Sequence, residues 1–210
     1  MKYEYTIKTI KELLNINNMK YYIPIGDWPL HITPYLDLMK NSGYTREEDP
    51  DKADFLLLPG GADIGMRPTR DEYEIHLYKR YRELGKPIIG ICRGLQLMIY
   101  LNEKMPGLLE HIPDYTEEIL HTTITGDWKG ESSWHTTELG LFVNSRHHQG
   151  VLAGDVHAYE VIDMTSDEIA EAIENKETKE FAVQWHPEHP EMSDTPALKW
   201  FICKLDKILN

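Results

Sequence analysis

The first half of the chain alternates short, almost continuously apolar runs with longer stretches of helical periodicity. Short apolar runs of this kind are typical of parallel strands that are buried on both faces. The predicted strands are residues 21–26, 53–58 and 87–91. The predicted helices are residues 33–42, 69–84 and 93–101. Strands that alternate with helices in this way predict a mainly parallel sheet with right-handed crossovers.

Capping residues mark the ends of two of these helices. Thr33 stands before a proline, as an N-cap would, and Thr69 and Glu72 have the spacing of a capping box. Gly43 and Gly85 follow the predicted C-terminal ends, where glycine commonly stops a helix.

The second half predicts shorter, β-rich structure. Residues 115–143 are rich in threonine, tryptophan and glycine, which favours short strands and loops. Further strands are expected at 156–162, at 168–174, where Ile169, Glu171 and Ile173 alternate, and at 181–185, with a hairpin turn at 175–178. A last helix opens at Thr195 and places Leu198, Phe201, Ile202 and Leu205 on one face. The expected fold class is therefore α/β with three layers: a central, mostly parallel sheet with helices on both faces and a small β-rich addition.

Length and composition indicate the number of domains, the kinds of partner and the compartment. The 210 residues suit a single domain over 1–210, in which residues 1–20 form an N-terminal extension with a short amphipathic helix from about Thr6. The net charge of −13 argues against nucleic-acid partners, because an acidic surface repels phosphates. No apolar run approaches the ~20 residues that span a bilayer, so no membrane partner is expected. The polar first twenty residues and only two cysteines predict a cytoplasmic protein.

The strongest chemical signal is the stretch from Pro87 to Met98, in which an apolar run ends at Cys92 and a helical pattern follows at once. A sharp strand-to-helix turn needs small neighbours, which Gly90 and Gly94 supply. Cys92 is then expected at the exposed tip, near a helix N-terminus whose dipole favours the thiolate. These features are typical of a nucleophile. Cys203, in a helical pattern near the C-terminus, is expected to be structural.

A second motif, residues 181–188, reads as a strand that runs out into His186-Pro187-Glu188. Residues i and i+2 on an extended chain point the same way, so Glu188 is expected to reach the imidazole of His186. Cys92, His186 and Glu188 together form a triad of nucleophile, base and orienting carboxylate.

These residues carry a family resemblance. Gly-Ile-Cys-Arg-Gly-Leu-Gln at 90–96 and Gln-Trp-His-Pro-Glu at 184–188 resemble the class I glutamine amidotransferases. Leu-Leu-Leu-Pro-Gly-Gly-Ala-Asp at 56–63 resembles the glycine loop of that family, and the motif at 143–151 resembles its γ-glutamyl hydrolase branch, peptidase C26. The resemblance departs at 101–107, where the family usually has a glycine-rich turn.

The resemblance implies an enzyme that hydrolyses a γ-glutamyl amide through a γ-glutamyl thioester, without a cofactor. It implies an oxyanion hole formed by Gly60 or Gly61 with the N–H of Arg93. It also implies substrate contacts, which are assigned to Gln96, Ser145, His147 and Gln149. The expected partner is a small γ-glutamyl compound or glutamine.

Several alternatives stay open at this stage. The chain could be a glutaminase subunit that supplies ammonia to a separate synthetase chain, a homo-oligomer, or a binding protein without activity. His186, Glu188, His189 and Glu191 could instead hold a metal, although no complementary ligand cluster with structural-zinc spacing exists, so no metal is predicted. Finally, Arg67, Arg70 and Asp71 could form either a cleft wall or ordinary surface charge.

Overall fold

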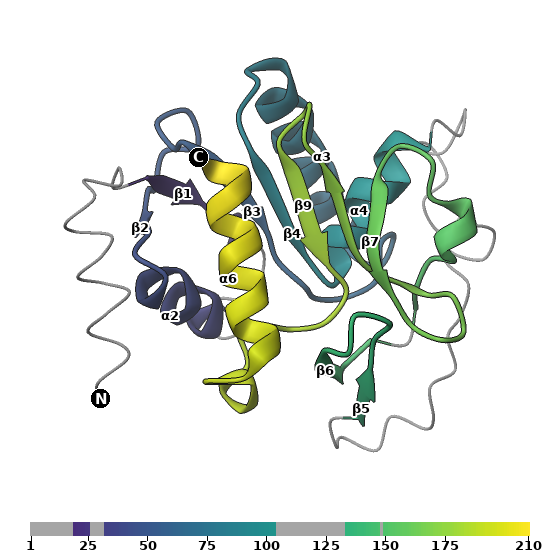
Figure 1. Ribbon diagram of the computed structural model, residues 1–210. Coiled ribbons are helices and arrows are strands. Elements are labelled where there is room, and N and C mark those ends of the chain that lie inside the picture. Colours follow the sequence, from purple (N-terminus) through teal and green to yellow (C-terminus); the bar gives the residue numbers. More distant parts are fainter. Residues whose placement is uncertain (1–18, 26–31, 104–132, 148) are drawn as a thin grey trace.

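The computed structural model describes residues 19–25, 32–103, 133–147 and 149–210 (Figure 1). Within them, a seven-stranded sheet has the order β2-β1-β3-β4-β9-β8-β7. The neighbours from β2 to β9 pair in parallel, and β8 pairs antiparallel with both β9 and β7. The strands are β1 (Lys20–Tyr22), β2 (Thr45–Arg46), β3 (Phe55–Leu58), β4 (Ile88–Ile91), β7 (Glu160–Met164), β8 (Ala170–Asn175) and β9 (Glu180–Val183). A separate antiparallel ribbon joins β5 (Ser133–Thr136) to β6 (Phe142–Ser145).

Helices cover both faces of the sheet, as the alternation of side chains along β3 illustrates. Leu56 and Leu58 pack in one core with α3 (Pro68–Glu83) and α4 (Arg93–Asn102). Phe55 and Leu57 pack in a second core with α2 (Thr33–Asn41) and α6 (Pro196–Leu209). In Figure 1, α6 lies in front of the sheet, and α3 and α4 lie behind it. The expected three-layer α/β fold with a small β-rich addition is confirmed.

Two helix starts differ from the sequence prediction. In α2 the cap position is Ile32, whose carbonyl already accepts from the Leu36 N–H at 3.1 Å, so Thr33 lies inside the helix. In α3 the cap is Arg67 and the proline after it takes the first turn, so Thr69 forms no capping box. Proline is favoured at this position because its missing N–H is not needed there.

In the second half of the chain, the predicted hairpin and the predicted start of the last helix are confirmed. The β8–β9 hairpin is present, and the Thr195 side chain caps α6 by accepting from the Leu198 N–H at 3.1 Å. In contrast, the strand expected at 156–162 lies at Glu160–Met164; a 3₁₀ turn, η3 (Ala153–Asp155), and an irregular segment at 156–159 precede it. A second 3₁₀ turn, η4 (Pro190–Met192), precedes α6.

One prediction for the C-terminal helix is wrong, and two others concern residues that the structure does not describe. Cys203 is exposed on α6, so it is not the packed structural cysteine that we expected. The helix expected from Thr6 and the strands and loops expected at 115–132 lie outside the described residues. No helix in the described part of the chain combines the length and apolar character needed to cross a bilayer.

Candidate functional site

The candidate site forms where β3, β4 and β9 end. These three strands are neighbours and run parallel, so their carboxyl ends meet at one edge of the sheet. Gly60 follows β3, Cys92 follows β4 and His186 follows β9. Ligands of open α/β sheets bind at such an edge. The topology therefore brings together three motifs that are far apart in sequence.

Cys92 occupies a strained turn between β4 and α4. Its backbone has φ 53° and ψ −108°, a conformation that a side-chain-bearing residue rarely adopts. A Cβ on Gly90 would lie 2.8 Å from the Gly94 carbonyl carbon, and one on Gly94 would lie 2.3 Å from the Leu58 carbonyl oxygen. Both glycines are therefore needed for the turn, as the sequence predicts. Contrary to expectation, Cys92 is only 7% exposed, because the Gly60 loop packs over it.

His186 lies beside Cys92 and contacts Glu188, with 2.6 Å between His186 Nδ1 and Glu188 Oε1. This is the contact that the i, i+2 spacing predicts. The backbone of His186 is clamped as well: its N–H donates to Asn144 Oδ1 at 2.9 Å, and its carbonyl accepts from Asn144 Nδ2 at 3.0 Å. Asn144 comes from β6, so the small ribbon holds the imidazole in place.

The charges around His186 favour the imidazolium. Burial alone would lower the pKa of His186, but the electrostatic interactions with Glu188 and with Cys92 outweigh it and raise that pKa well above its ordinary value. Burial would raise the pKa of Glu188, but the attraction of His186 leaves it below its ordinary value. The arrangement thus suits an ionised carboxylate beside a charged imidazole.

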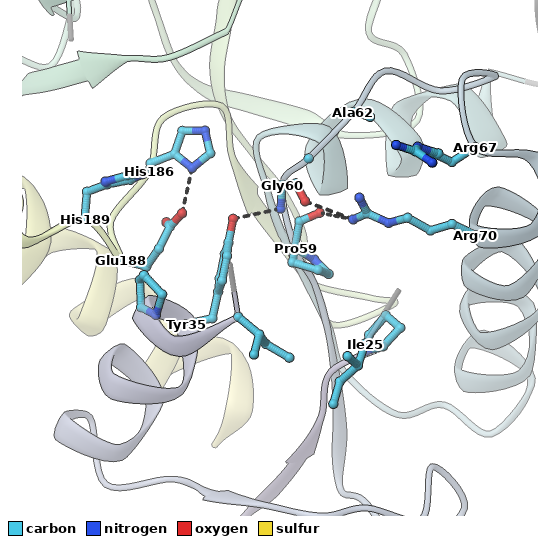
Figure 2. Close-up of a pocket in the computed structure, with 14 residues that line it drawn as sticks. Ile25, Tyr35, Pro59, Gly60, Ala62, Arg67, Arg70, His186, Glu188 and His189 are labelled. Carbon is cyan, nitrogen blue, oxygen red and sulfur yellow. Dashed lines mark hydrogen bonds and ion pairs between the residues drawn. The ribbon is translucent and has the colours of Figure 1, made fainter. Parts of the chain in front are cut away.

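The glycine loop after β3 is held by a tyrosine that the sequence analysis did not single out (Figure 2). The Gly60 N–H donates to the Tyr35 hydroxyl at 3.0 Å. Burial, followed by the nearby charge of Glu188, raises the pKa of Tyr35 well above its ordinary value, so the phenol is neutral. A Cβ on Gly60 would lie 2.9 Å from both His186 Cε1 and the Tyr35 hydroxyl.

The side chain of Arg93 is buried against two carboxylates. It contacts Asp71 and Glu74 of α3, and all three side chains are almost fully buried. Glu74 also accepts from Arg70 Nε at 2.7 Å. We refer to Arg70, Asp71, Glu74 and Arg93 as the ion cluster. Of the three residues considered for a cleft wall, Arg67 and Arg70 line a pocket, whereas Asp71 is buried below it.

Gln96 points into the site from the first turn of α4 and is buried. Its Nε2 donates to the Gln149 carbonyl at 2.9 Å and to Gln184 Oε1 at 3.2 Å. Gln184 Nε2 in turn lies 3.6 Å from Cys92 Sγ. Gln96 is thus connected to the cysteine through Gln184.

The residues expected at the substrate rim lie together after β6. Ser145 Oγ is 3.3 Å from His147 Nε2, and His147 Nδ1–H donates to the Gln149 carbonyl at 3.0 Å. Burial lowers the pKa of His147. Glu171, which the predicted strand places on the same face as Ile169 and Ile173, is fully buried, with Oε1 3.7 Å from His147 Nε2 and 3.2 Å from His135 Nε2.

A pocket of about 400 Å³ opens beside His186 and Glu188 (Figure 2). Its walls combine apolar residues of the β1 and α2 regions with the glycine loop and arginines near the start of α3. The lining residues are Pro24, Ile25, Ile32, Pro34, Tyr35, Pro59, Gly60, Gly61, Ala62, Arg67, Arg70, His186, Glu188 and His189. Asn102, at the altered 101–107 stretch, is not among them: its amide donates at 2.7 Å to the Met98 carbonyl and the Tyr159 hydroxyl, at the far end of α4. Residues 104–107 lie outside the described residues.

One group of three side chains in the described ranges has the spacing of metal ligands: His186, Glu188 and His189. Glu191, the fourth residue weighed for a metal, is engaged at 2.8 Å by Arg146. In addition, Glu188 is occupied by His186, so a metal would compete with this contact.

Four further residues contact the predicted site residues, although the sequence did not point to them: Tyr35, Asn144, Glu171 and Gln184. Gln184 precedes His186 by two positions, so the spacing argument used for Glu188 could have found it. Tyr35 and Glu171 carry no comparable local signal, since only the packing of α2 and β8 brings them to the site.

Comparisons with known proteins show what this chain is similar to. The glutamine amidotransferase-like protein YvdE of Lactococcus lactis subsp. lactis is 32% identical over 157 residues, which cover 64% of this chain and 66% of that protein. GMP synthase [glutamine-hydrolyzing] of Streptococcus mutans is 34% identical over 142 residues, 63% of this chain and 24% of that protein. The chain thus spans two thirds or less of these relatives.

A solved structure supports the fold. The glutaminase domain of Trypanosoma brucei CTPS with bound acivicin superimposes with a TM-score of 0.64 at 15% identity, covering 91% of this chain and 94% of that one. The family model of Peptidase C26 matches residues 51–188, from the glycine loop to Glu188 and more than half of the chain. The chain therefore belongs to the Peptidase C26 family, within the glutamine amidotransferase-like proteins.

Proposed function

We propose that this protein hydrolyses the γ-glutamyl amide bond of a small γ-glutamyl compound through a thioester on Cys92. The observation that carries the proposal is the Cys92 turn beside the His186–Glu188 pair, with 2.6 Å between Nδ1 and Oε1. A thiol, an imidazole and an orienting carboxylate are the parts that covalent acyl transfer needs.

In the first half-reaction the Cys92 thiolate attacks the γ-carbonyl carbon. A C–S bond forms, and the electron pair of the carbonyl π bond moves to oxygen. The N–H of Arg93, with that of Gly60 or Gly61, stabilises the oxyanion. His186 gives its proton to the amine nitrogen, the carbonyl re-forms and the C–N bond breaks. The amine departs, and a γ-glutamyl thioester remains on Cys92. In the second half-reaction His186 takes a proton from water, which attacks the thioester and releases glutamate and the thiolate.

The glutamyl half is assigned to the Gln96 side of Cys92. Gln96, Ser145, His147 and Gln149 are linked to one another by hydrogen bonds, and Gln184 connects Gln96 to Cys92. A substrate that lacks the glutamyl group would leave the buried Gln149 Oε1 atom unpaired, so we expect selection against other acyl groups to be steep.

The pocket beside His186 supports an amine larger than ammonia. Ammonia is about the size of water, which occupies roughly 30 Å³ of liquid, whereas this pocket has about 400 Å³. Arg67 on its wall favours an amine half that carries a negative charge; the charge of Arg70 is paired with Glu74. We therefore assign the choice of amine to this lining.

The second candidate function is a glutaminase subunit that passes ammonia to a separate synthetase chain. The similarity to GMP synthase favours it, because the matched part covers only 24% of that longer protein. Under this alternative, free glutamine is the best substrate and a partner chain raises its turnover.

A comparison of kcat/KM for γ-glutamyl-γ-aminobutyrate, neutral γ-glutamyl amides and glutamine tests the proposal, with Cys92→Ala as the inactive control. We expect γ-glutamyl-γ-aminobutyrate to be cleaved better than glutamine, and Cys92→Ala to stay folded and inactive. If glutamine is preferred, the glutaminase alternative replaces the hydrolase. If Cys92→Ala retains turnover, or no γ-glutamyl compound forms a thioester, the mechanism is wrong.

A further inference from the structure

The sequence leaves open which glycine of the Gly60–Gly61 pair faces the nucleophile. We infer that Arg70 is a positioning residue: it fixes the direction of the Gly60–Gly61 peptide and thereby makes the Gly61 N–H the glycine donor of the oxyanion hole. The inference rests on the proposed function for its catalytic meaning, although its geometric content can be tested without activity.

The direction of the peptide follows from two hydrogen bonds. Arg70 Nη2 donates to the Gly60 carbonyl at 2.9 Å and to the Pro59 carbonyl at 3.3 Å. The C=O and N–H of one trans peptide unit point in opposite directions. Because the Gly60 carbonyl points toward Arg70, the Gly61 N–H points away from it.

The side away from Arg70 is the side of the nucleophile. Figure 2 shows Arg70 and His186 on opposite sides of Gly60. A Cβ on Gly60 would lie 2.9 Å from His186 Cε1 and 3.4 Å from Cys92 Cβ, so the loop directly abuts both residues. The Gly60 N–H cannot serve this role in the same state, since it donates to the Tyr35 hydroxyl at 3.0 Å. The Gly61 N–H is therefore the donor that remains for a developing oxyanion.

The guanidinium of Arg70 is itself held by the ion cluster. Its Nε donates to Glu74 at 2.7 Å, and Glu74 also contacts Arg93, whose own N–H is the second proposed oxyanion donor. Both donors are thus linked to one group of two cations and two carboxylates, in which Asp71, Glu74 and Arg93 are almost fully buried and Arg70 is partly exposed. We expect this linkage to limit the movement of the Gly60 carbonyl relative to α4, on which Arg93 lies.

Residue 61 must be glycine for this arrangement to exist. It has φ 144°, which side-chain-bearing residues rarely adopt. A Cβ there would lie 2.1 Å from Arg70 Nη1, so any side chain would displace the guanidinium from the two carbonyls. The glycine and the arginine therefore act as a matched pair.

Replacing Arg70 with Met tests the inference, because Met keeps much of the side-chain length but cannot donate. We expect kcat to fall by about 10²–10³, as for the loss of one oxyanion donor, with KM changed much less. Alkylation of Cys92 by iodoacetamide should be unaffected, since that displacement at a saturated carbon forms no oxyanion. Arg70→Lys should recover part of kcat, because its ammonium reaches one carbonyl but not both.

Arg80→Met is the matched control, since Arg80 lies on the same helix and pairs with Asp51 at 2.6 Å in an exposed position. Added methylguanidinium should restore part of kcat to Arg70→Ala and leave the control unchanged. Unchanged kcat in Arg70→Met would overturn the inference. A parallel fall in kcat and in the alkylation rate would also overturn it, because it would indicate general damage to the site.

A crystal structure of Arg70→Met separates the failure of this inference from the failure of the proposed function. We expect the Gly60–Gly61 peptide to be reversed or to occupy two orientations. If the peptide keeps its direction without Arg70, the inference is wrong whatever the enzyme cleaves. If the wild-type protein cleaves no γ-glutamyl compound but the peptide does reverse, the proposed function fails and the positioning role of Arg70 stands.

Discussion

A single methyl group at Gly60 should impair catalysis without unfolding the protein. The backbone of Gly60 lies outside the left-handed region, so alanine can adopt it, and the effect of Gly60→Ala is therefore steric. The new Cβ would lie 2.9 Å from both His186 Cε1 and the Tyr35 hydroxyl, closer than real Cβ contacts. Since both neighbours are buried and hydrogen-bonded, the glycine loop or the imidazole has to move.

The size of the effect follows from the distance that must be gained. An ordinary contact begins at 3.4 Å, so His186 Cε1 or the loop has to withdraw by roughly half an ångström or more. A misplacement of about 1 Å costs about 10²-fold in rate. We therefore expect kcat/KM to fall by about 10- to 100-fold, which corresponds to about 1.4–2.7 kcal/mol of transition-state stabilisation.

The assay compares kcat/KM of Gly60→Ala with that of Gly154→Ala. Gly154 also lies outside the left-handed region, and a Cβ there would meet nothing within 4 Å, so the control should keep wild-type activity. Thermal unfolding of both variants checks that the fold is retained. Activity of Gly60→Ala within twofold of the control would refute the reasoning, because it would mean that the loop and the imidazole have no fixed spacing.

Two further predictions concern charge. Glu188→Gln removes the charge that raises the pKa of His186, so kcat/KM should fall by about two to four orders of magnitude and its basic limb should move to lower pH; an unmoved limb would contradict the assignment. A histidine whose pKa is raised on folding stabilises the fold fully below its unfolded pKa of 6.5, and a carboxylate whose pKa is lowered does so above its unfolded pKa of 4.5. The loss of Tm in this variant should therefore be largest between pH 4.5 and pH 6.5. It should shrink as the pH rises through the folded pKa of His186. Asp71→Asn breaks a buried contact with Arg93 and should cost about 3 kcal/mol in urea unfolding, whereas Asp51→Asn, in an exposed pair, should cost less than about 1 kcal/mol; equal costs would show that burial of the ion cluster has no special role.

The sequence by itself determined the order of the elements and the residues of the chemical core. The apolar runs at 53–58 and 87–91 became β3 and β4, because a strand buried on both faces has no alternative to an apolar sequence. Gly90 and Gly94 identified the turn at Cys92, since the close approach of backbone there excludes any Cβ. The two-residue spacing of His186 and Glu188 predicted their contact, because it depends only on local geometry.

Local signals failed where two of them competed or where both strand faces were covered. Thr69 had the spacing of a capping box, but α3 begins at the proline before it, Pro68, and its N-cap is Arg67. Glu171 shares a strand face with Ile169 and Ile173, and the pattern along that strand did not show that His135 of β5 and His147 after β6 lie against its carboxylate. A pattern along one strand cannot reveal what packs on its second face.

Only the tertiary structure decided how the motifs act on one another. The strand order β3-β4-β9 brought Gly60, Cys92 and His186 to one edge, although they are separated by tens of residues in the chain. Packing of α2 brought Tyr35 to the Gly60 N–H, and packing of α3 brought Arg70 to the Gly60 carbonyl. The direction of a peptide bond is set by the partners of its N–H and C=O, and those partners came from distant elements, so the sequence could name both glycines but could not choose between them.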